Sequence, residues 1–377
     1  MLAMSAVAVR LQDCFSDLTD PRRREVTYPL INIVTIALCA VICGADDFVS
    51  IAEFGRKKQK WLAGFLDLSA GIPSHDRFNA VLGALRPAEF EKCLLSWITA
   101  LHEITGGQIV ASDGKTLRRS FDAASSKAAI HMVSAWATAN HISLGQIVVD
   151  EKSNEITAIP KLLEILELSG CLVTIDAMGC QTEIAAQIVA AEADYVLAVK
   201  GNQPTLHDGI VKFFLDHLED DFARVPVSRY QTEEHDHGRD ETRTYYVCPV
   251  PDDLPDRPRW KQLAAIGIAI NDTLRAGQQT SEVRYYILSR KLSAKKFGAA
   301  VRGHWSIENR LHWQLDVTFG EDQSRLRKGH VDANFSILRR TALSLLKNNR
   351  TMKVGVKNKR LAAGWDHDYL AQVLSGT

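Results

Sequence analysis

Residues 171–200, CLVTIDAMGCQTEIAAQIVAAEADYVLAVK, place a predicted helix between two predicted strands. The apolar runs at 171–175 and 195–199 have the length and the branched side chains of buried strands. Between them, residues 181–191 repeat apolar side chains at helical spacing. A strand, a helix and a second strand in this order are typical of a parallel sheet with a helix on one face.

The sequence before this stretch extends the same sheet. Residues 108–112, 131–138 and 142–150 predict three strands, the last two joined by a turn at Ala139-Asn140, and residues 157–168 predict another helix. Three strands followed by alternating helices and strands favour an α/β fold with a mixed sheet, whose parallel half is flanked by helices.

The rest of the chain divides into further regions. Residues 1 to about 105 predict helices only, so we expect a helical N-terminal domain before the α/β domain at 106–346. Short β-prone segments among polar and Pro-rich loops predict a β-rich insertion at about 200–290, and residues 347–377 predict a basic C-terminal tail. Two helices joined by a short turn in the first region fit a DNA-reading helix-turn-helix or an ordinary helical hairpin.

Composition narrows the class of protein. The chain has 377 residues, 46% of them hydrophobic and 24% charged, which is the composition of a globular protein. Its longest apolar run, residues 30–43, is too short to span a bilayer, and the N-terminus lacks the pattern of a secretory signal, so we expect a cytoplasmic protein without a membrane segment. Seven cysteines without a Cys-x-x-Cys pair predict free thiols.

The net charge of zero hides an uneven distribution. Residues 290–377 contain 17 Lys and Arg against 7 Asp and Glu, so the rest of the chain is acidic. A polyanion such as DNA would be attracted to this C-terminal part.

Three carboxylates are candidates for one metal site. Asp113 and Asp176 each follow a predicted strand, and ligands of α/β sheets collect at strand ends. Glu308 lies beside the apolar stripe of a predicted helix, formed by Ile307 and Leu311, and that helix can face the sheet. Three carboxylates suit Mg²⁺ or Mn²⁺, and such a site can hold two ions for phosphoryl transfer.

Other interpretations of the same residues stay open. Each aspartate alone is also a common turn former, and Glu308 alone could be a solvated helix carboxylate. His304, Glu308 and His312 are spaced like zinc ligands on one helix face, although the spacing is not His-Glu-x-x-His. The chain lacks a Gly-x-Ser-x-Gly motif and a phosphate-binding loop, which argues against serine and nucleotide chemistry.

Basic and aromatic residues accompany the carboxylates in the sequence. We expect the basic side chains among them to contact DNA phosphates without reading bases, although each of them alone could be a solvated surface charge. They are Lys115, Arg118, Lys200 with the nearby Asn202, Arg325, Arg327 and Lys328. Trp305 and Trp313 could stack on an unpaired base or pack in the core.

Several motifs stand out along the chain: DPRRR (20–24), IPSHD (72–76), DGKTLR (113–118), DEKSNEITAIP (150–160), DAMGCQ (176–181), KGNQ (200–203), HGR (237–239) and HWSIENRLHW (304–313). As a set, covering nearly the whole chain, they resemble the H-repeat-associated insertion-sequence transposases.

This resemblance implies a ribonuclease-H-like core with a DDE triad formed by Asp113, Asp176 and Glu308. It implies metal-dependent cleavage of double-stranded DNA at the ends of a mobile element, followed by attack of the freed 3′-hydroxyl on target DNA. It further implies a homodimer on paired ends, end recognition or assembly by the helical N-terminal domain, and a nucleoid location when bound. The matching motifs add to the predicted DNA contacts Arg239, Arg302, His304, Arg310 and His312.

The sequence departs from one pattern of related transposases. Those that form DNA hairpins carry Arg four residues before the third carboxylate and Lys seven residues after it, where this chain has His304 and Leu315. Arg302 or His312 are the candidate substitutes. Two alternatives to a working transposase stay open: a structure-selective nuclease on the same fold, and a catalytically silent DNA-binding relic.

Overall fold

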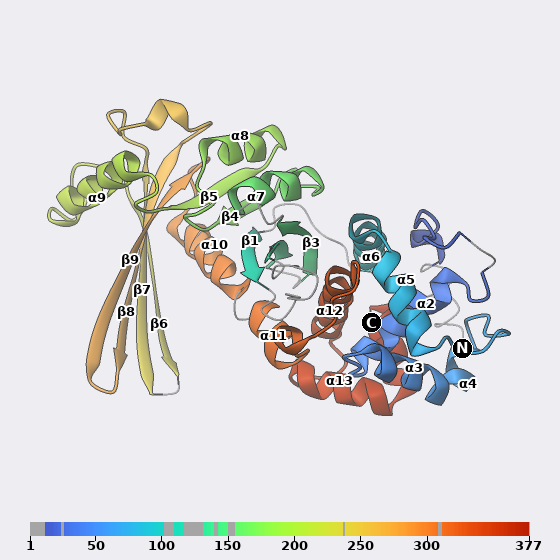
Figure 1. The fold of residues 1–377 in the computed structure, drawn as a ribbon. Coiled ribbons are helices and arrows are strands. Elements are labelled where there is room, and N and C mark those ends of the chain that lie inside the picture. Colours follow the sequence, from blue (N-terminus) through green and yellow to red (C-terminus); the bar gives the residue numbers. More distant parts are fainter. Residues whose placement is uncertain are drawn as a thin grey trace.

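The structure is a computed structural model, which describes residues 12–23, 26–101, 109–116, 131–138, 142–149, 155–236, 238–307 and 311–376. Figure 1 shows three parts in a row. A long antiparallel arm stands at one end, a central sheet with helices on its faces follows, and a lobe of helices at the other end holds both chain termini.

Within the described residues, nine strands form one sheet in the order β3-β2-β1-β4-β5-β9-β8-β7-β6. The strands are β1 (Ile109–Thr116), β2 (His131–Ala137), β3 (Ile142–Val149), β4 (Leu172–Ile175), β5 (Asp194–Val199), β6 (Ser228–Asp236), β7 (Arg239–Pro249), β8 (Ala265–Arg275) and β9 (Gln278–Leu288). Strands β1, β4 and β5 are parallel, and the remaining pairs are antiparallel. The predicted mixed sheet with a parallel half is confirmed.

Helices cover both faces of the central sheet, β1–β5 (Figure 1). On one face lie α7 (Glu155–Glu164) and α8 (Thr182–Ala190), and on the other lies α10 (Ala294–Ile307). All four residues of β4 are buried, as a parallel strand between two helical layers must be. This burial explains why three of its four residues, Leu172, Val173 and Ile175, are apolar.

The arm, β6–β9, lies in the region predicted to be β-rich. Its strands β7, β8 and β9 are each 11 residues long, and β9 is exposed at the tip and buried at the base. Helix α9 (Pro204–Leu218) precedes the arm. Phe297 of α10 packs edge-on against Tyr245 and Tyr286 of the arm, which fixes α10 across the junction between arm and central sheet.

The helical lobe combines segments from both ends of the chain. Its helices are α2 (Leu30–Ile42), α3 (Phe48–Lys57), α4 (Gln59–Leu62), α5 (His75–Ala84), α6 (Pro87–Leu101), α12 (Val331–Asn348), α13 (Val356–Trp365) and α14 (His367–Ser375). Helix α12 is buried from Val331 to Leu346 and contacts α2, α5 and α6. Asn334 of α12 donates hydrogen bonds to the carbonyl oxygens of Leu82 (2.7 Å) and Leu85 (2.9 Å), and so caps the end of α5.

Part of the predicted basic tail, residues 347–377, is built into this lobe. The ammonium of Lys359 donates to the carbonyl oxygens of Leu346 and Asn349, and Arg360 donates to that of Val41. Both side chains are buried, so their charges satisfy helix ends and are not displayed to solvent.

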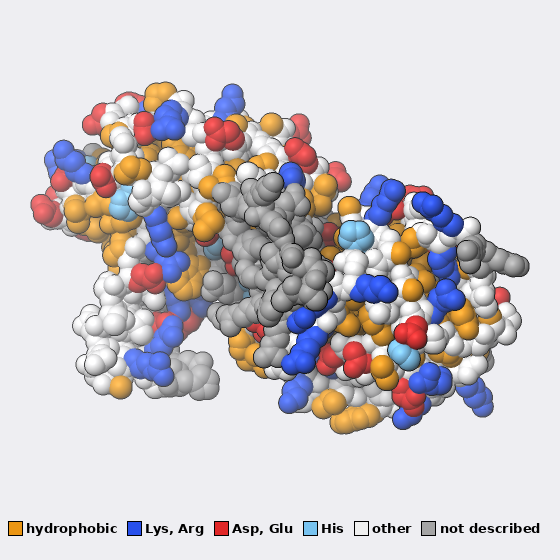
Figure 2. Space-filling model, viewed as in Figure 1, with side chains coloured by type: hydrophobic (Ala, Val, Ile, Leu, Met, Phe, Trp, Pro, Cys, Tyr) orange, Lys and Arg blue, Asp and Glu red, His pale blue; other side chains and the backbone are white. Residues whose placement is uncertain are grey.

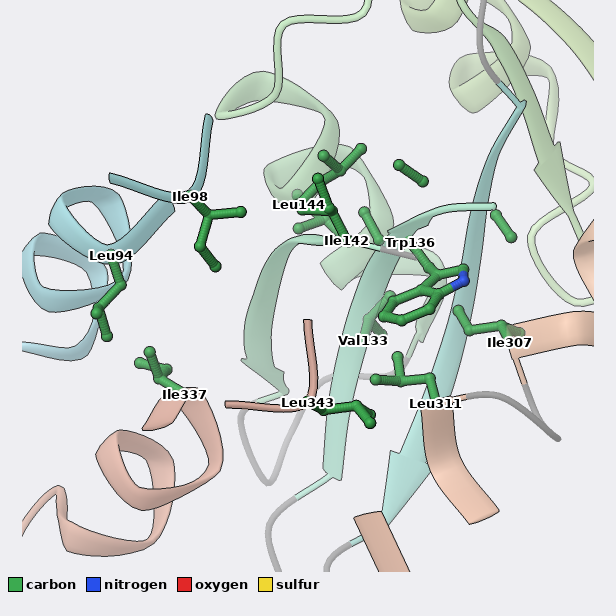
Figure 3. Packing of buried hydrophobic residues seen from close by; sticks show 14 of the residues in the cluster. Leu94, Ile98, Val133, Trp136, Ile142, Leu144, Ile307, Leu311, Ile337 and Leu343 are labelled. Carbon is green, nitrogen blue, oxygen red and sulfur yellow. The ribbon is translucent and has the colours of Figure 1, made fainter. Parts of the chain in front are cut away.

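The hydrophobic core joins the lobe to the central sheet (Figure 3). Ile98 of α6 and Ile337 of α12 approach strands β2 and β3 from the lobe, while Ile307 and Leu311 lie against the indole of Trp136. All seven cysteines are free, as predicted, and five of them are buried. In the described part of the chain no helix is long and apolar enough to cross a membrane.

Candidate active site

Strand register places Asp113 and Asp176 side by side. The last parallel pair between β1 and β4 is Ser112 with Ile175, so each aspartate is the residue that follows a member of this pair. Asp176 follows the end of β4, as predicted. The prediction that Asp113 also ends its strand is wrong, because β1 continues to Thr116 and Asp113 pairs with Ser134 of β2. Asp113 therefore follows the end of the parallel pairing between β1 and β4, and it does not end strand β1.

Both aspartates lie on the face of the sheet that α10 covers. Thr174, two residues before Asp176, bonds through its hydroxyl to Nδ1 of His304 in α10 (3.3 Å). Ile109, four residues before Asp113, lies within van der Waals reach of Gly303 in the same helix. Because side chains of a strand alternate between faces, Asp113 shares the face of Ile109.

The loop after Asp176 is held from two sides. The backbone amide of Gly179 donates to Oδ1 of Asp176 (3.3 Å), and a Cβ at Gly179 would come within 2.3 Å of Ile175. From the turn after β5, Asn202 donates to the carbonyl oxygen of Ala177 (2.6 Å) and Gln203 to that of Cys180 (3.0 Å). The amide of Asn202, a predicted DNA contact, thus serves the loop that carries Asp176.

Glu308, the third predicted carboxylate, lies outside the described residues, as do Arg118 and Arg310. The nearest described residues before and after it belong to the core. Ile307, the last residue of α10, and Leu311 are both buried and point toward Trp136 of β2 (Figure 3). Trp136 pairs with Ala111 of β1, so this contact lies on the face that holds Asp113.

Behind Asp113, on the same face of β1, Lys115 is buried in a cluster of charges. Its ammonium binds Oε2 of Glu321 at 2.9 Å and also contacts Asp316. Glu321 lies in a one-turn 3-10 helix, η3 (Glu321–Gln323), and accepts a hydrogen bond from Ser336 of α12 (2.7 Å). We call Lys115, Asp316, Glu321, Ser336 and Arg340 the Lys115 cluster.

Electrostatics keeps the cluster ionised. Burial alone would raise the pKa of Glu321, but the positive charges of Lys115, Arg340 and Arg339 and the Ser336 hydroxyl lower this pKa to about 2. Burial raises the pKa of Asp316, against the lowering effect of Lys115. The cluster therefore offsets the charge of Lys115 close to the aspartates.

Two histidines face the aspartates as neutral groups. Nδ1 of His312 lies 3.5 Å from Oδ2 of Asp113, and burial, together with Arg340 and Lys115, lowers the pKa of His312 to about 3. This contact is a weak polar contact and not an ion pair, because the ring is uncharged at neutral pH. Burial also lowers the pKa of His304, which Asp176 and Thr174 oppose.

The remaining predicted DNA contacts lie on two surfaces. Lys200, exposed after β5, lines a small cavity with Asp176 and His304. Arg239 of β7 and Arg302 of α10 line a larger cavity between the arm and α10. Further away, Arg325, Arg327 and Lys328 lie between η3 and α12, with Arg325 and Lys328 exposed.

Among the described residues, no group of three His, Cys, Asp or Glu side chains is arranged to hold a metal. The zinc interpretation also gains no support from contacts, because His304 bonds to β4 while His312 faces β1. Leu315, at the position of the lysine of hairpin-forming transposases, is wholly buried.

Comparison with known proteins assigns the chain to a family. A family model described as a transposase DDE domain matches residues 104–345, and the model of its associated domain matches residues 12–98. The chain belongs to the DDE transposase family. It is a DNA transposase by descent, and DNA cleavage and strand transfer with divalent metal ions are the general activity of that family.

Two curated relatives match nearly the full length of this transposase. It is 40% identical to YhhI of Escherichia coli, named as an H repeat-associated transposase, over 98% of both chains. It is 41% identical to YncI, also named as a transposase of Escherichia coli, over 97% of this chain and 94% of that one. Among solved structures, a piggyBac transposase synaptic complex with hairpin DNA is 12% identical with a TM-score of 0.35, covering 98% of this chain and 81% of that one, which is too weak to carry an argument.

Sequence reasoning missed several charged residues of this transposase. Arg339 and Arg340 interrupt the apolar run of α12, which was the available signal that they are buried and paired. Glu321 and Arg284 carried no such signal, because Glu321 binds Lys115 from far away in the sequence and Arg284 stacks on Trp305 of another element.

Proposed function

We propose that this transposase cuts and joins DNA at a metal site formed by Asp113, Asp176 and Glu308. The observation that carries the proposal is the register of β1 and β4, which sets two carboxylates on adjacent strands under the same helix. Neighbouring strands lie about 4.8 Å apart, so both side chains can reach one ion or a pair of ions.

The residues present fit Mg²⁺ or Mn²⁺. Both described candidates are carboxylates, the ligands that these cations prefer. The nearby cation, Lys115, is held by Glu321 and Asp316, and His312 is neutral, so neither adds an uncompensated positive charge beside Asp113. Glu308 is the proposed third ligand, because Ile307 and Leu311 anchor its segment on the same face of the sheet.

Bound at this site, two such ions would supply an activated hydroxyl nucleophile and stabilise the leaving oxygen of a phosphoryl transfer. The chain itself would hold the ligands in place. Gly179 and Asn202 fix the loop of Asp176, and the Lys115 cluster fixes the strand of Asp113.

The proposed core of the catalytic domain is ribonuclease-H-like. Support comes from the order β3-β2-β1-β4-β5, in which three consecutive antiparallel strands are followed by two parallel strands with helices between them. Asp113 then lies in the first strand and Asp176 directly after the fourth, and these two strands are neighbours in the sheet.

The proposed partner is double-stranded DNA, as element ends and as target, bound by a homodimer in the cytoplasm. Exposed residues carry the proposed phosphate contacts: Lys200, Arg239, Arg302, Arg325 and Lys328. Lys115, Asn202, His304 and His312 already bond or contact other groups within the protein, so we propose that they position the site. The helical lobe is the proposed end-recognition and assembly region.

The test is cleavage of a labelled duplex that carries the inverted repeats flanking the gene. We expect cleavage at the repeat boundary that requires Mg²⁺ or Mn²⁺ and stops with a chelator. Asp113→Asn, Asp176→Asn and Glu308→Gln should each abolish cleavage and retain duplex binding. Glu183→Gln is the matched control, because Glu183 is an exposed carboxylate in the first turn of α8.

Three outcomes would contradict the proposal. Cleavage that survives Asp176→Asn would remove the aspartate from the mechanism. Binding of the repeats by the unaltered protein without cleavage would identify a catalytically silent DNA-binding relic. Cleavage of branched DNA without repeats would identify a structure-selective nuclease.

A further inference from the structure

A groove lies between α10 and the arm. It encloses a cavity of about 620 Å³, bounded by α10 on one side and by β7, β8 and β9 on the other. Four arginines from three elements line it: Arg239 and Arg243 of β7, Arg284 of β9 and Arg302 of α10. Figure 2 shows basic and acidic side chains together along the arm where it joins the body.

Acidic residues hold these guanidinium groups in place. Glu234 of β6 binds Arg243 (2.8 Å) and Arg302. Both arginines lower the pKa of Glu234, and Arg302 has the larger effect. Glu241, which is buried, binds Arg239 and Arg243. A guanidinium has five N–H donors. Each arginine uses at most two of them in these ion pairs, so donors remain for a phosphate.

An aromatic side chain lies in the same groove. The guanidinium carbon of Arg284 lies 3.7 Å from the ring centre of Trp305, which remains 39% exposed. An arginine-backed indole with exposed surface is a stacking platform for a nucleic-acid base.

The groove leads to the carboxylate site. A second cavity of about 40 Å³ is lined by Asp176, Lys200 and His304, and it shares four lining residues with the groove. The shared residues are Arg284, Tyr286, Val301 and Trp305. A strand that occupies the groove would therefore lie beside the cavity that Asp176 lines.

We propose that this groove binds a single unpaired DNA strand next to the reacting phosphate. The inference rests on the proposed function of Asp176. A groove with basic side chains and a stacking platform is the arrangement that single strands use. Its volume lies in the range of about 300 to 1,000 Å³ that holds one small ligand, which fits one or two nucleotides and not a duplex.

The experiment compares two probes with the full-length protein in EDTA, where binding is separate from cleavage. One probe is the repeat duplex with a blunt end, and the other is the same duplex with an extension of five thymidines on one strand, tried on each strand in turn. We expect tighter binding of one extended probe. Trp305→Ala should weaken that binding by about 5- to 150-fold and leave blunt binding within about twofold, because stacking is worth about 1–3 kcal/mol per base.

Matched variants separate the groove from general damage. Trp313→Ala is the control, because Trp313 is 52% exposed, lies in α11 (Trp313–Val317) and does not line the groove. Trp305→Phe should restore most of the affinity. Arg302→Gln should reduce the slope of log affinity against log salt concentration for the extended probe by about 0.7, the value of one phosphate contact with a single strand.

Equal affinity for blunt and extended probes, or equal losses in Trp305→Ala and Trp313→Ala, would overturn the inference and leave the proposed metal site intact. If cleavage is absent and the preference for the extended probe is preserved, the proposed metal site fails and the groove inference stands. If neither probe binds, both proposals fail.

Discussion

Glu321→Gln is the substitution that tests the Lys115 cluster most directly. Glutamine keeps the shape of the side chain and removes its charge. Glu321 is wholly buried, its Oε2 accepts from Lys115 at 2.9 Å, and its Oε1 accepts from Ser336 at 2.7 Å. The change leaves Lys115 and Arg340 with a smaller negative charge to balance them in a site without solvent.

The size of the effect follows from the pKa of Glu321. The pKa falls from 4.5 to about 2 on folding, and a difference of one in pKa is worth about 1.4 kcal/mol, so the ionised carboxylate contributes about 3 kcal/mol to stability at pH 7. This agrees with a loss of about 3–5 kcal/mol when one partner of a buried ion pair is removed. Because the folded pKa is lowered, the contribution is complete above pH 4.5 and disappears as the pH falls through 2.

The assay is the free energy of unfolding in urea for the original protein, Glu321→Gln and the exposed control Glu219→Gln. We expect Glu321→Gln to be about 3 kcal/mol less stable at pH 7 and about 1 kcal/mol less stable at pH 3. Glu219→Gln should match the original protein at both values. A loss below about 0.5 kcal/mol at pH 7, or a loss that does not change with pH, would refute the assignment of this stability to the ionised cluster.

Three further substitutions test the local geometry. Gly179→Ala puts a methyl group within 2.3 Å of Ile175, so we expect a loss of about 1–3 kcal/mol in unfolding free energy and slower cleavage of the repeat duplex. Asn334→Ala removes the donor to Leu82 and Leu85, which should cost about 1–3 kcal/mol and lower the melting temperature; an unchanged melting temperature would contradict the role of this cap. Asn202→Ala frees the loop of Asp176, so the cleavage rate should fall more than duplex affinity, and equal losses would indicate a DNA contact instead.

The strands and helices around the site were predictable because their signals are local. Alternating and continuous apolar runs gave β2, β4, β5 and α8 nearly at their observed bounds. The end of β1 was not predictable in this way. Asp113, Gly114 and Lys115 are polar or small, and only pairing with β2 and the partners of Lys115 keep them in the strand.

The role of a single charged side chain depends on whether it is buried, and the sequence does not show this. Lys115 looks like a phosphate contact beside Asp113, but its partner Glu321 is 206 residues away and meets it only in the folded chain. Likewise, Lys359 and Arg360 belong to the basic C-terminal region, and the structure places both inside the helical lobe.

The sequence alone determined the α/β class of the fold, the family and the place of Asp176 directly after a strand, because periodicity and motif spacing are properties of neighbouring residues. Only the tertiary structure decided which charges face solvent and which hold the site together. A buried charge must meet an opposite charge or a polar group, and those partners come from distant segments that the chain brings together only when it folds.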